Sequence, residues 1–483
     1  MVFNSIVFIV FFAFVCLFLA LTNIKKLKNA WGVENMIRIR KVFLLVCSYI
    51  FYGWADWKCC SLVLAITVIA YVCARLIEKG KHRKLYAAIS VILPLLILGV
   101  FKYFNFFISS FRDIFGLEDA GALNLLLPVG ISFFTFQGIA YTVDVYRKTV
   151  PAERDFLTVA LYIAFFPKLL TGPIVKAKTF LPQLKEDRSV TLGGLAQGAQ
   201  IFMFGLFKKI VIADNISVFV GDVFGKPKEY GAVSLIFAVI AYSIQIYCDF
   251  SGYSDMAIGC AKCIGYDIDR NFNMPYIAKN IGEFWKRWHI SLSEWLQNYL
   301  YIPLGGNRKG KLRTYLNNFL TMLIGGLWHG AAWTFVAWGA LHGAALCVHK
   351  AFRSITKRDK SYRGTAVGRI AGAVFTYVFV CFCWIFFRAD SFENAWAVIK
   401  GIFTWQPGVL HISSHCVAAI ILIAVCFAIA AIRSKKLKLP TVEGFYPFVN
   451  LNTVFGLTVF IVFTGITLAL AFTGSNPFIY FQF

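Results

Sequence analysis

Two histidines in aromatic, apolar surroundings are the side chains of this sequence best suited to chemistry. His329 lies in Gly326-Leu-Trp-His-Gly-Ala-Ala-Trp333, inside a stretch that has the composition of a membrane segment. His289 lies 40 residues earlier, in an aromatic stretch that begins at Phe284. An ionisable side chain at membrane depth is costly, so its default interpretation is functional. An imidazole exchanges protons near neutral pH and suits general acid–base catalysis. The alternative for each is a hydrogen-bonded structural histidine.

A second group of polar residues interrupts an apolar run upstream of the histidines. Two carboxylates and two hydroxyls fall within seven residues: Asp249, Ser251, Tyr253 and Asp255. The two carboxylates are six positions apart and do not share one face of a straight helix, so we expect a broken helix that lines a cavity. These residues could fix the tautomer of an imidazole or bind a polar substrate. Helix capping or bonding between helices is the structural alternative.

The remaining candidates flank the two histidines. Trp328 precedes His329 and is a candidate substrate contact. Arg287, Asn307 and Arg308 could bind the phosphates of a nucleotide-bearing donor. Ordinary positive charge in loops is the alternative for these three. The sequence contains no zinc-spaced Cys/His cluster, no Gly-Lys-Ser/Thr phosphate loop and no Gly-x-Ser-x-Gly elbow, so no metal site is predicted.

Composition sets the class of protein that must position these residues. The chain has 483 residues, of which 59% are hydrophobic and 15% charged, whereas soluble domains carry about 25% charged residues. At ~20 residues per helix, the apolar runs predict an all-α polytopic membrane protein with about 11–13 membrane helices and re-entrant segments. The net charge of +24 falls in short loops between these runs. That is the positive-inside pattern, which indicates a lipid bilayer and not a nucleic acid as partner.

We expect a single integral-membrane domain over residues 1–483. Its core, about 125–350, is interrupted by helix-breaking and polar residues, which predicts a central cavity or tunnel. Peripheral helices are expected over 1–124 and 365–475, among them about 41–55, 59–77, 85–108, 367–387, 413–432 and 450–472. Basic loops on the inside place both termini outside the cytoplasm. Residues 314–348 are predicted to form a short hairpin, with Gly325-Gly326 loosening the helix near its apex.

Four motifs in order resemble the membrane-bound O-acyltransferase family, in particular its bacterial alginate O-acetyltransferase branch. They span Gln245–Gly259, Phe284–Ser293, Tyr299–Arg308 and Gly326–Trp333. The resemblance implies that His329 is the catalytic histidine and that His289 occupies the second histidine position. It also implies a cytoplasmic acyl-CoA, most simply acetyl-CoA, as the donor substrate, with no tightly bound cofactor.

The expected function is therefore a multipass acyltransferase of the cell membrane. It would move acetyl groups from acetyl-CoA across the membrane to O-acetylate an extracellular polysaccharide or cell-wall glycan. The resemblance implies a partner acetyltransferase of the SGNH-hydrolase type, extracellular or membrane-anchored, which contacts the glycan. The tail from Asn476 to Phe483 is a candidate docking element or an inert interfacial anchor. The alternatives are D-alanyl transfer to teichoic acid from a carrier-protein thioester and a non-enzymatic transporter or flippase.

Overall fold

The fold is almost entirely helical in the computed structural model, which describes residues 1–54, 56–116, 123, 127–356, 365–436, 449–474 and 476–479. Within these ranges the β pairing is limited to one isolated bridge between Tyr230 and Val409. The prediction of an all-α protein is confirmed.

The chain divides into two compact units. Unit 1 contains Met1–Met203 and Tyr253–Asp269, and unit 2 contains Phe204–Gly252 and Arg270–Phe483. The divisions at 203/204 and 252/253 fall within helices α11 (Leu192–Leu206) and α13 (Ala232–Cys263). The single membrane domain expected from the sequence is not tested by this division and stays a prediction.

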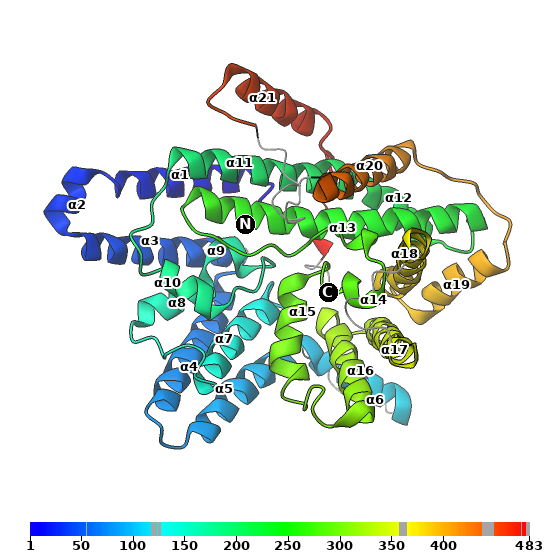
Figure 1. Cartoon of the computed structure of the whole chain (residues 1–483), viewed down its shortest axis with the longest axis horizontal. Helices are drawn as coiled ribbons and strands as arrows, with labels where there is room; N and C mark the ends of the chain where they lie inside the picture. The colour runs from blue at the N-terminus through cyan, green and yellow to red at the C-terminus, as the bar shows by residue number, and fades with distance from the viewer. Residues whose placement is uncertain are drawn as a thin grey trace. The chain divides into compact units, whose positions relative to one another are not determined.

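Unit 1 is built around α7, whose residues from Ile131 to Thr142 are all buried. Helices α4 and α5 pack against it and against each other, as Figure 1 shows in blue and cyan. The helices of this unit before α11 are α1 (Ile6–Leu21), α2 (Lys25–Trp31), α3 (Val33–Gly53), η1 (Trp57–Cys59), α4 (Cys60–Glu78), α5 (Arg83–Leu98), η2 (Gly99–Tyr103), α6 (Phe104–Phe115), α7 (Ile131–Tyr146), α8 (Phe156–Ala164), α9 (Phe166–Leu169) and α10 (Ala177–Gln183).

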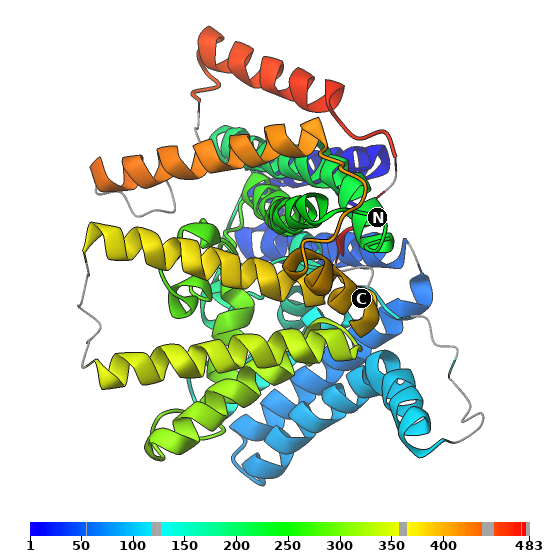
Figure 2. The same ribbon diagram turned by 90° about the vertical axis from the view of Figure 1, so that its right-hand side faces the viewer.

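Unit 2 contains both predicted histidines and several long helices. Figure 2 shows α17, α18 and α20 in yellow-green, yellow and orange, roughly parallel to one another. Its elements beyond α11 and α13 are η3 (Phe207–Ala213), α12 (Asp214–Gly225), η4 (Pro275–Ile277), α14 (Ile281–Phe284), α15 (Ile290–Leu296), η5 (Gln297–Tyr301), α16 (Gly310–His329), α17 (Trp333–Ile355), α18 (Ala366–Arg388), α19 (Phe392–Phe403), α20 (Ser414–Lys436) and α21 (Val454–Ala469).

Several helices are long and apolar enough to cross a membrane, so the polytopic class is confirmed. By length and composition, the described residues contain four such spans, or five if the bent pair α1–α2 is one span. The four are Trp57–Glu78, Arg83–Phe115, Ala232–Cys263 and Ala366–Arg388. This number is below the about 11–13 segments expected from apolar runs at ~20 residues each. Part of the apolar sequence forms short helices, among them α8, α9 and α10, and does not form full spans.

Helices α4, α18, α20 and α21 match the predicted 59–77, 367–387, 413–432 and 450–472 to within four residues. Helix α3 begins eight residues before the predicted 41–55, and the predicted 85–108 is divided among α5, η2 and α6.

The predicted break in the helix carrying Asp249 and Asp255 is wrong. Helix α13 runs without interruption for 32 residues. Gly252, within it, permits close packing: a Cβ there would lie 2.7 Å from the carbonyl oxygen of Gly205. Gly252 therefore allows the backbones of α13 and α11 to pack closely and does not bend α13.

The hairpin predicted at 314–348 is present as α16 and α17, which pack against each other. Its turn lies at Gly330–Ala332, whereas Gly325-Gly326 lie inside α16, so the predicted loosening there is wrong. A Cβ on Gly326 would lie 2.9 Å from the Cα of Gly339 on α17, so the small residues allow close contact. At ~1.5 Å per residue the arms are roughly 30 and 35 Å long, more than the short hairpin expected.

Part of the positive charge near the N-terminus is internal. Arg40 is 3% exposed, and its guanidinium donates to Asp187 at 2.7 Å and to the Thr22 hydroxyl at 2.8 Å. The Lys41 ammonium lies 2.6 Å from Asp155. These two cations therefore hold elements of unit 1 together, in addition to any role in membrane orientation.

Candidate active site

His329 is the last residue of α16 and is 3% exposed. Its imidazole meets three aromatic rings edge to face: Trp328 at 5.0 Å, Trp338 at 4.9 Å and Phe387 at 5.2 Å between centroids. The carbonyl end of a helix stabilises a positive charge. An imidazole that takes up a proton at this place therefore gains its charge where the helix favours it.

The glycine that follows His329 is required by packing. Gly330 has an extended backbone at the end of α16, and a Cβ there would lie 2.1 Å from the ring of Phe335. Phe335 also packs on Phe387, the same ring that contacts His329. The Trp-His-Gly motif thus places an imidazole at the end of a helix and lets an aromatic ring close over the turn.

His289 is completely buried and has a left-handed backbone, with φ at 43°. A left-handed conformation is unfavourable for residues with a side chain and persists where neighbours hold it. Asn271 supplies that hold: its carbonyl accepts from Ile290 N at 2.8 Å, and its side-chain oxygen accepts from Ser291 N and Oγ at 3.1 and 2.9 Å. The same oxygen lies 3.1 Å from His289 Nδ1.

These contacts define the tautomer of His289. Because Asn271 Oδ1 already accepts from Ser291, it is an oxygen and not an amide nitrogen, and His289 Nδ1 must be the donor to it. A neutral imidazole that donates from Nδ1 carries its lone pair on Nε2. His289 is therefore oriented with Nε2 as the atom able to accept a proton.

Aromatic rings connect the two histidines. Trp328 lies 6.0 Å from the His289 ring and 5.0 Å from the His329 ring. Phe250 of α13 packs edge to face on His289 at 4.6 Å. The structure thus brings Trp328, His289 and His329 into one cluster in unit 2.

Asp249 lies in a buried ion-pair network. Lys209 Nζ lies 2.6 Å from Asp249 and 2.7 Å from Asp214, and all three side chains are at most 7% exposed. The second oxygen of Asp249 accepts from the backbone N of Ile479 at 2.9 Å, and Lys209 also donates to the carbonyl of Asn476 at 3.4 Å. In the structure Asp249 thus joins η3, α12 and the C-terminal segment.

The C-terminal segment is held inside unit 2 over the residues that the structure describes. The Asn476 amide donates to Ser217 Oγ at 2.6 Å, and Phe478 and Ile479 are 3% and 6% exposed. The Phe478 ring lies 5.8 Å from Phe250, which in turn contacts His289. Phe478 and Ile479 therefore form part of the interior beside the candidate site. Residues 480–483 lie outside the described residues.

The other hydroxyl and carboxylate candidates have different surroundings. The Ser251 hydroxyl accepts from Lys208 Nζ at 3.1 Å in unit 2. Tyr253 and Asp255 belong to unit 1, where both are buried and the Tyr253 ring packs against Phe3 at 4.7 Å. Their predicted role in substrate binding stays a prediction.

The candidate phosphate-binding residues differ in their availability. Arg287 pairs with Glu283 at 2.9 Å and donates to the carbonyl of Asn273, so much of its capacity is used within the protein. Asn307 and Arg308 are exposed in the loop before α16. The buried Asn317 anchors this loop by donating to the Gly306 carbonyl at 2.9 Å.

Sequence reasoning missed three residues of this region: Asn271, Lys209 and His342. Asn271 and Lys209 carry no local signal, because their roles depend on contacts formed by the fold. His342 did offer a signal, since it is ionisable within an apolar run and lies four positions after Trp338, on the same helix face.

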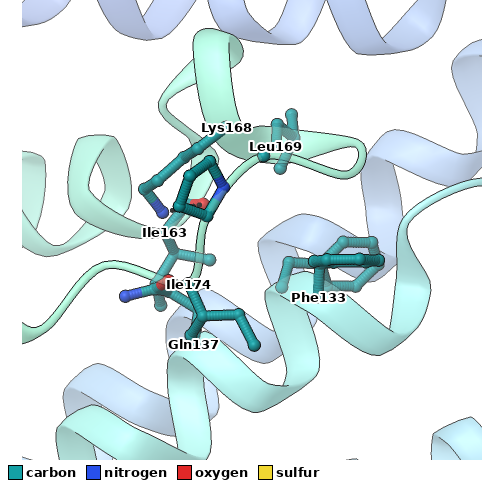
Figure 3. Close-up of a pocket in the computed structure, with 9 residues that line it drawn as sticks. Phe133, Gln137, Ile163, Lys168, Leu169 and Ile174 are labelled. Carbon is teal, nitrogen blue, oxygen red and sulfur yellow. Dashed lines mark hydrogen bonds between the residues drawn. The ribbon is translucent and has the colours of Figure 1, made fainter. Parts of the chain in front are cut away.

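Figure 3 shows a further buried cation, Lys168 of unit 1. Its pocket has a volume of about 10 Å³, room for about one water.

Within the described parts of the chain, no three His, Cys, Asp or Glu side chains lie close enough to hold a metal ion. The arrangement in unit 2 instead offers two enclosed imidazoles. Such groups can take a proton from a hydroxyl and return it to a leaving group. An all-α membrane protein with two such imidazoles is a candidate for a membrane-embedded enzyme.

Comparison with known proteins defines the family. Residues 151–389 match the profile of MBOAT, the membrane-bound O-acyltransferase family. The chain is 39% identical over 446 residues to the probable alginate O-acetylase AlgI of Azotobacter vinelandii, covering 90% of this chain and 85% of that protein. It therefore belongs to the membrane-bound O-acyltransferase family.

Two further relatives indicate the range of similarity. The peptidoglycan O-acetyltransferase of Helicobacter pylori is 39% identical over 391 residues, covering 75% of this chain and 73% of that protein. The teichoic acid D-alanyltransferase of Bacillus subtilis is 27% identical over 282 residues, covering 56% of this chain and 71% of that protein.

Proposed function

We propose that this protein transfers acetyl groups from cytoplasmic acetyl-CoA across the cell membrane for the O-acetylation of an extracellular polysaccharide or cell-wall glycan. The observation that supports this most directly is the enclosed pair His289 and His329, joined through Trp328. The names of the relatives support the acetyl group and the glycan: alginate and peptidoglycan O-acetylation occur among those 39% identical.

In the proposed reaction His329 is the general base. Its imidazole takes the proton from an acceptor hydroxyl as the hydroxyl oxygen forms a bond to the thioester carbonyl carbon. The carbon–sulfur bond then breaks, and the leaving thiolate takes the proton back from the imidazolium, so the histidine is regenerated. A positioned base of this kind contributes typically 10²–10⁴-fold to the rate. His289, fixed by Asn271, assists as a second proton-accepting group or by orienting the reactants.

The proposal also includes a partner protein and the orientation of the chain in the membrane. A separate SGNH-hydrolase-type acetyltransferase, extracellular or membrane-anchored, would receive the acetyl group and pass it to the glycan. Both termini would be extracytoplasmic. The predicted role of the tail as a docking element would fall to residues 480–483, because Phe478 and Ile479 are buried.

D-alanyl transfer to teichoic acid is the alternative within the family. A teichoic acid D-alanyltransferase is among the relatives, but at 27% identity over 56% of this chain. The O-acetyltransferases are more similar and match more of the chain. A transporter or flippase is the alternative from another class.

The test uses purified protein in lipid vesicles with two labelled donors, acetyl-CoA and a D-alanyl carrier-protein thioester, and with a sample without donor as the blank. We expect consumption of acetyl-CoA only, and loss of at least about 100-fold in that activity for His329→Ala. A His411→Ala variant, changed at a histidine elsewhere in unit 2, should retain activity. Consumption of the D-alanyl thioester would instead support the teichoic acid alternative, and consumption of neither donor would support a transporter. Full activity of His329→Ala would contradict the role of His329 as the base.

A further inference from the structure

His342 is a third histidine near the candidate site, and its hydrogen-bonding capacity is not used within the described residues. It lies on α17 and is 0% exposed. Neither its Nδ1 nor its Nε2 has a hydrogen-bond partner among the residues that the structure describes. Leaving a buried polar atom unsatisfied costs ~1–3 kcal/mol, and native proteins seldom do so without a reason.

Two indoles beside His342 also have buried nitrogens without a hydrogen-bond partner among the described residues. The Trp285 ring lies 5.1 Å from His342 and the Trp338 ring 4.7 Å. The Nε1 atoms of both indoles are buried and, like the His342 nitrogens, have no partner in the described part of the chain. Three neighbouring side chains therefore offer two N–H donors and an imidazole that can donate from one nitrogen and accept at the other.

The rest of the surroundings of His342 are apolar. Phe284 stacks at 6.1 Å and Phe379 meets the ring edge at 5.8 Å. The protein therefore supplies a small polar group in an aromatic lining, a composition typical of small-molecule binding sites. A planar amide suits it, because indole N–H groups can donate to its carbonyl and an imidazole nitrogen can accept from its N–H.

The position of His342 relates it to the proposed reaction. Trp338 contacts both His342 and His329, at 4.7 and 4.9 Å. On the other side of His342, α17 continues to His349 and Lys350 near its basic end. His342 thus lies on α17 between this basic end and the Trp338 ring that contacts His329.

We propose that His342, Trp285 and Trp338 form a binding subsite for an amide of the pantetheine arm that carries the acetyl thioester. This inference rests on the proposed function, since it requires a pantetheine thioester as donor. His342 and the two indoles are positioning residues here, because they hold the arm and do not exchange a proton with the reacting atoms.

The experiment compares donors that differ in the arm. The purified protein in lipid vesicles is given acetyl-CoA, S-acetyl-N-acetylcysteamine, which retains one amide, and S-acetylbutanethiol, which has none. For His342→Phe and Trp285→Phe we expect KM to rise about 5–10-fold for the two amide-bearing donors, with kcat little changed and with S-acetylbutanethiol unaffected. Phe455→Leu, at a residue of α21 that is 77% exposed in the same unit, is the control and should leave the kinetics with all three donors unchanged.

The possible results test the amide subsite and the proposed acetyl transfer separately. An equal loss of activity of His342→Phe with all three donors would overturn the amide subsite and leave a structural role. Unchanged kinetics of this variant with all donors would overturn it as well. A wild-type protein that consumes none of the three donors contradicts the proposed function itself, which is therefore tested separately from the subsite. A His342→Gln variant, which keeps a donor and an acceptor, should recover part of the lost affinity.

Discussion

The residues around the two histidines fix the position and the hydrogen bonding of each buried imidazole. His289 is fixed by the side chain and backbone of Asn271, and His329 is placed at the carbonyl end of α16. In the first case a hydrogen bond selects the tautomer, and in the second a helix end favours the charged form. Aromatic rings enclose both imidazoles, so in the proposed reaction proton transfer would take place away from bulk water.

The Lys209 network yields a prediction at the same scale. Lys209→Met leaves the carboxylates of Asp214 and Asp249 buried without their shared cation. Breaking one side of a buried ion pair costs about 3–5 kcal/mol, so the midpoint of thermal unfolding in detergent should fall markedly. Lys228→Met breaks an exposed pair with Glu393, whose side chains are 74% and 78% exposed, and should change little.

A second variant, Asp249→Asn, tests whether Asp249 stabilises the fold or contacts the substrate. If Asp249 acts through Lys209, Asp249→Asn should lower the unfolding midpoint and the acetyl transfer together. Reduced transfer with an unchanged midpoint would instead favour the direct substrate contact expected from the sequence.

At the scale of elements, the sequence predicted the regular helices well because long apolar runs have few alternatives in a membrane. Helices α4, α18 and α21 match their expected ranges within a few residues. The break in α13 was wrongly predicted because the polar residues near Asp249 suggested an interruption. In the structure Lys209, 40 positions away, satisfies that carboxylate inside a continuous helix. Such distant pairing cannot be read from local composition. His329 and His289 could be proposed from the sequence because an ionisable residue in an apolar run is a local signal.

The contact between α16 and α17 gives a prediction for the hairpin. A Cβ at Gly339 would lie 2.5 Å from the carbonyl oxygen of Met322, so Gly339→Ala must separate the two helices. We expect a lower unfolding midpoint and reduced acetyl transfer, because α16 carries His329 at its end. Gly465→Ala in α21 is a matched control, since nothing lies within 4 Å of its Cβ position. Similar stability of the two variants would contradict close packing of the hairpin.

The contact between α3 and the segment around Asp187 predicts a dependence of stability on pH. Partial burial raises the pKa of Asp187, but hydrogen bonds from Lys28 and Arg40 outweigh that effect and hold the pKa below its usual 3.8. The stabilisation is therefore complete above the unfolded pKa and is lost as the pH falls through the lower folded pKa. Asp187→Asn should lower the unfolding midpoint at pH 6, and the difference from the unchanged protein should shrink as the pH falls below about 4. A difference that stays constant with pH would contradict this.

At the scale of the whole molecule, family membership and composition define a membrane enzyme, and the positive-inside rule predicts its orientation. The loop containing Asn307 and Arg308 is exposed and basic, and Val2 near the N-terminus is 41% exposed. If the proposed orientation holds, cysteines at these two places face opposite sides of the membrane, and acetyl-CoA is used only from the side of the loop.

This prediction can be measured in vesicles containing either Asn307→Cys or Val2→Cys. A membrane-impermeant maleimide identifies which end faces outward, with the unchanged protein as the control for the native cysteines, and acetyl-CoA is then added outside or trapped inside. Vesicles in which Asn307→Cys is labelled should consume external acetyl-CoA, because the donor must enter past the basic ends of the hairpin to reach His329. Those in which Val2→Cys is labelled should consume only the trapped donor. Consumption from both sides irrespective of labelling would contradict a one-sided donor path, and labelling of both cysteines from one side would contradict the proposed orientation.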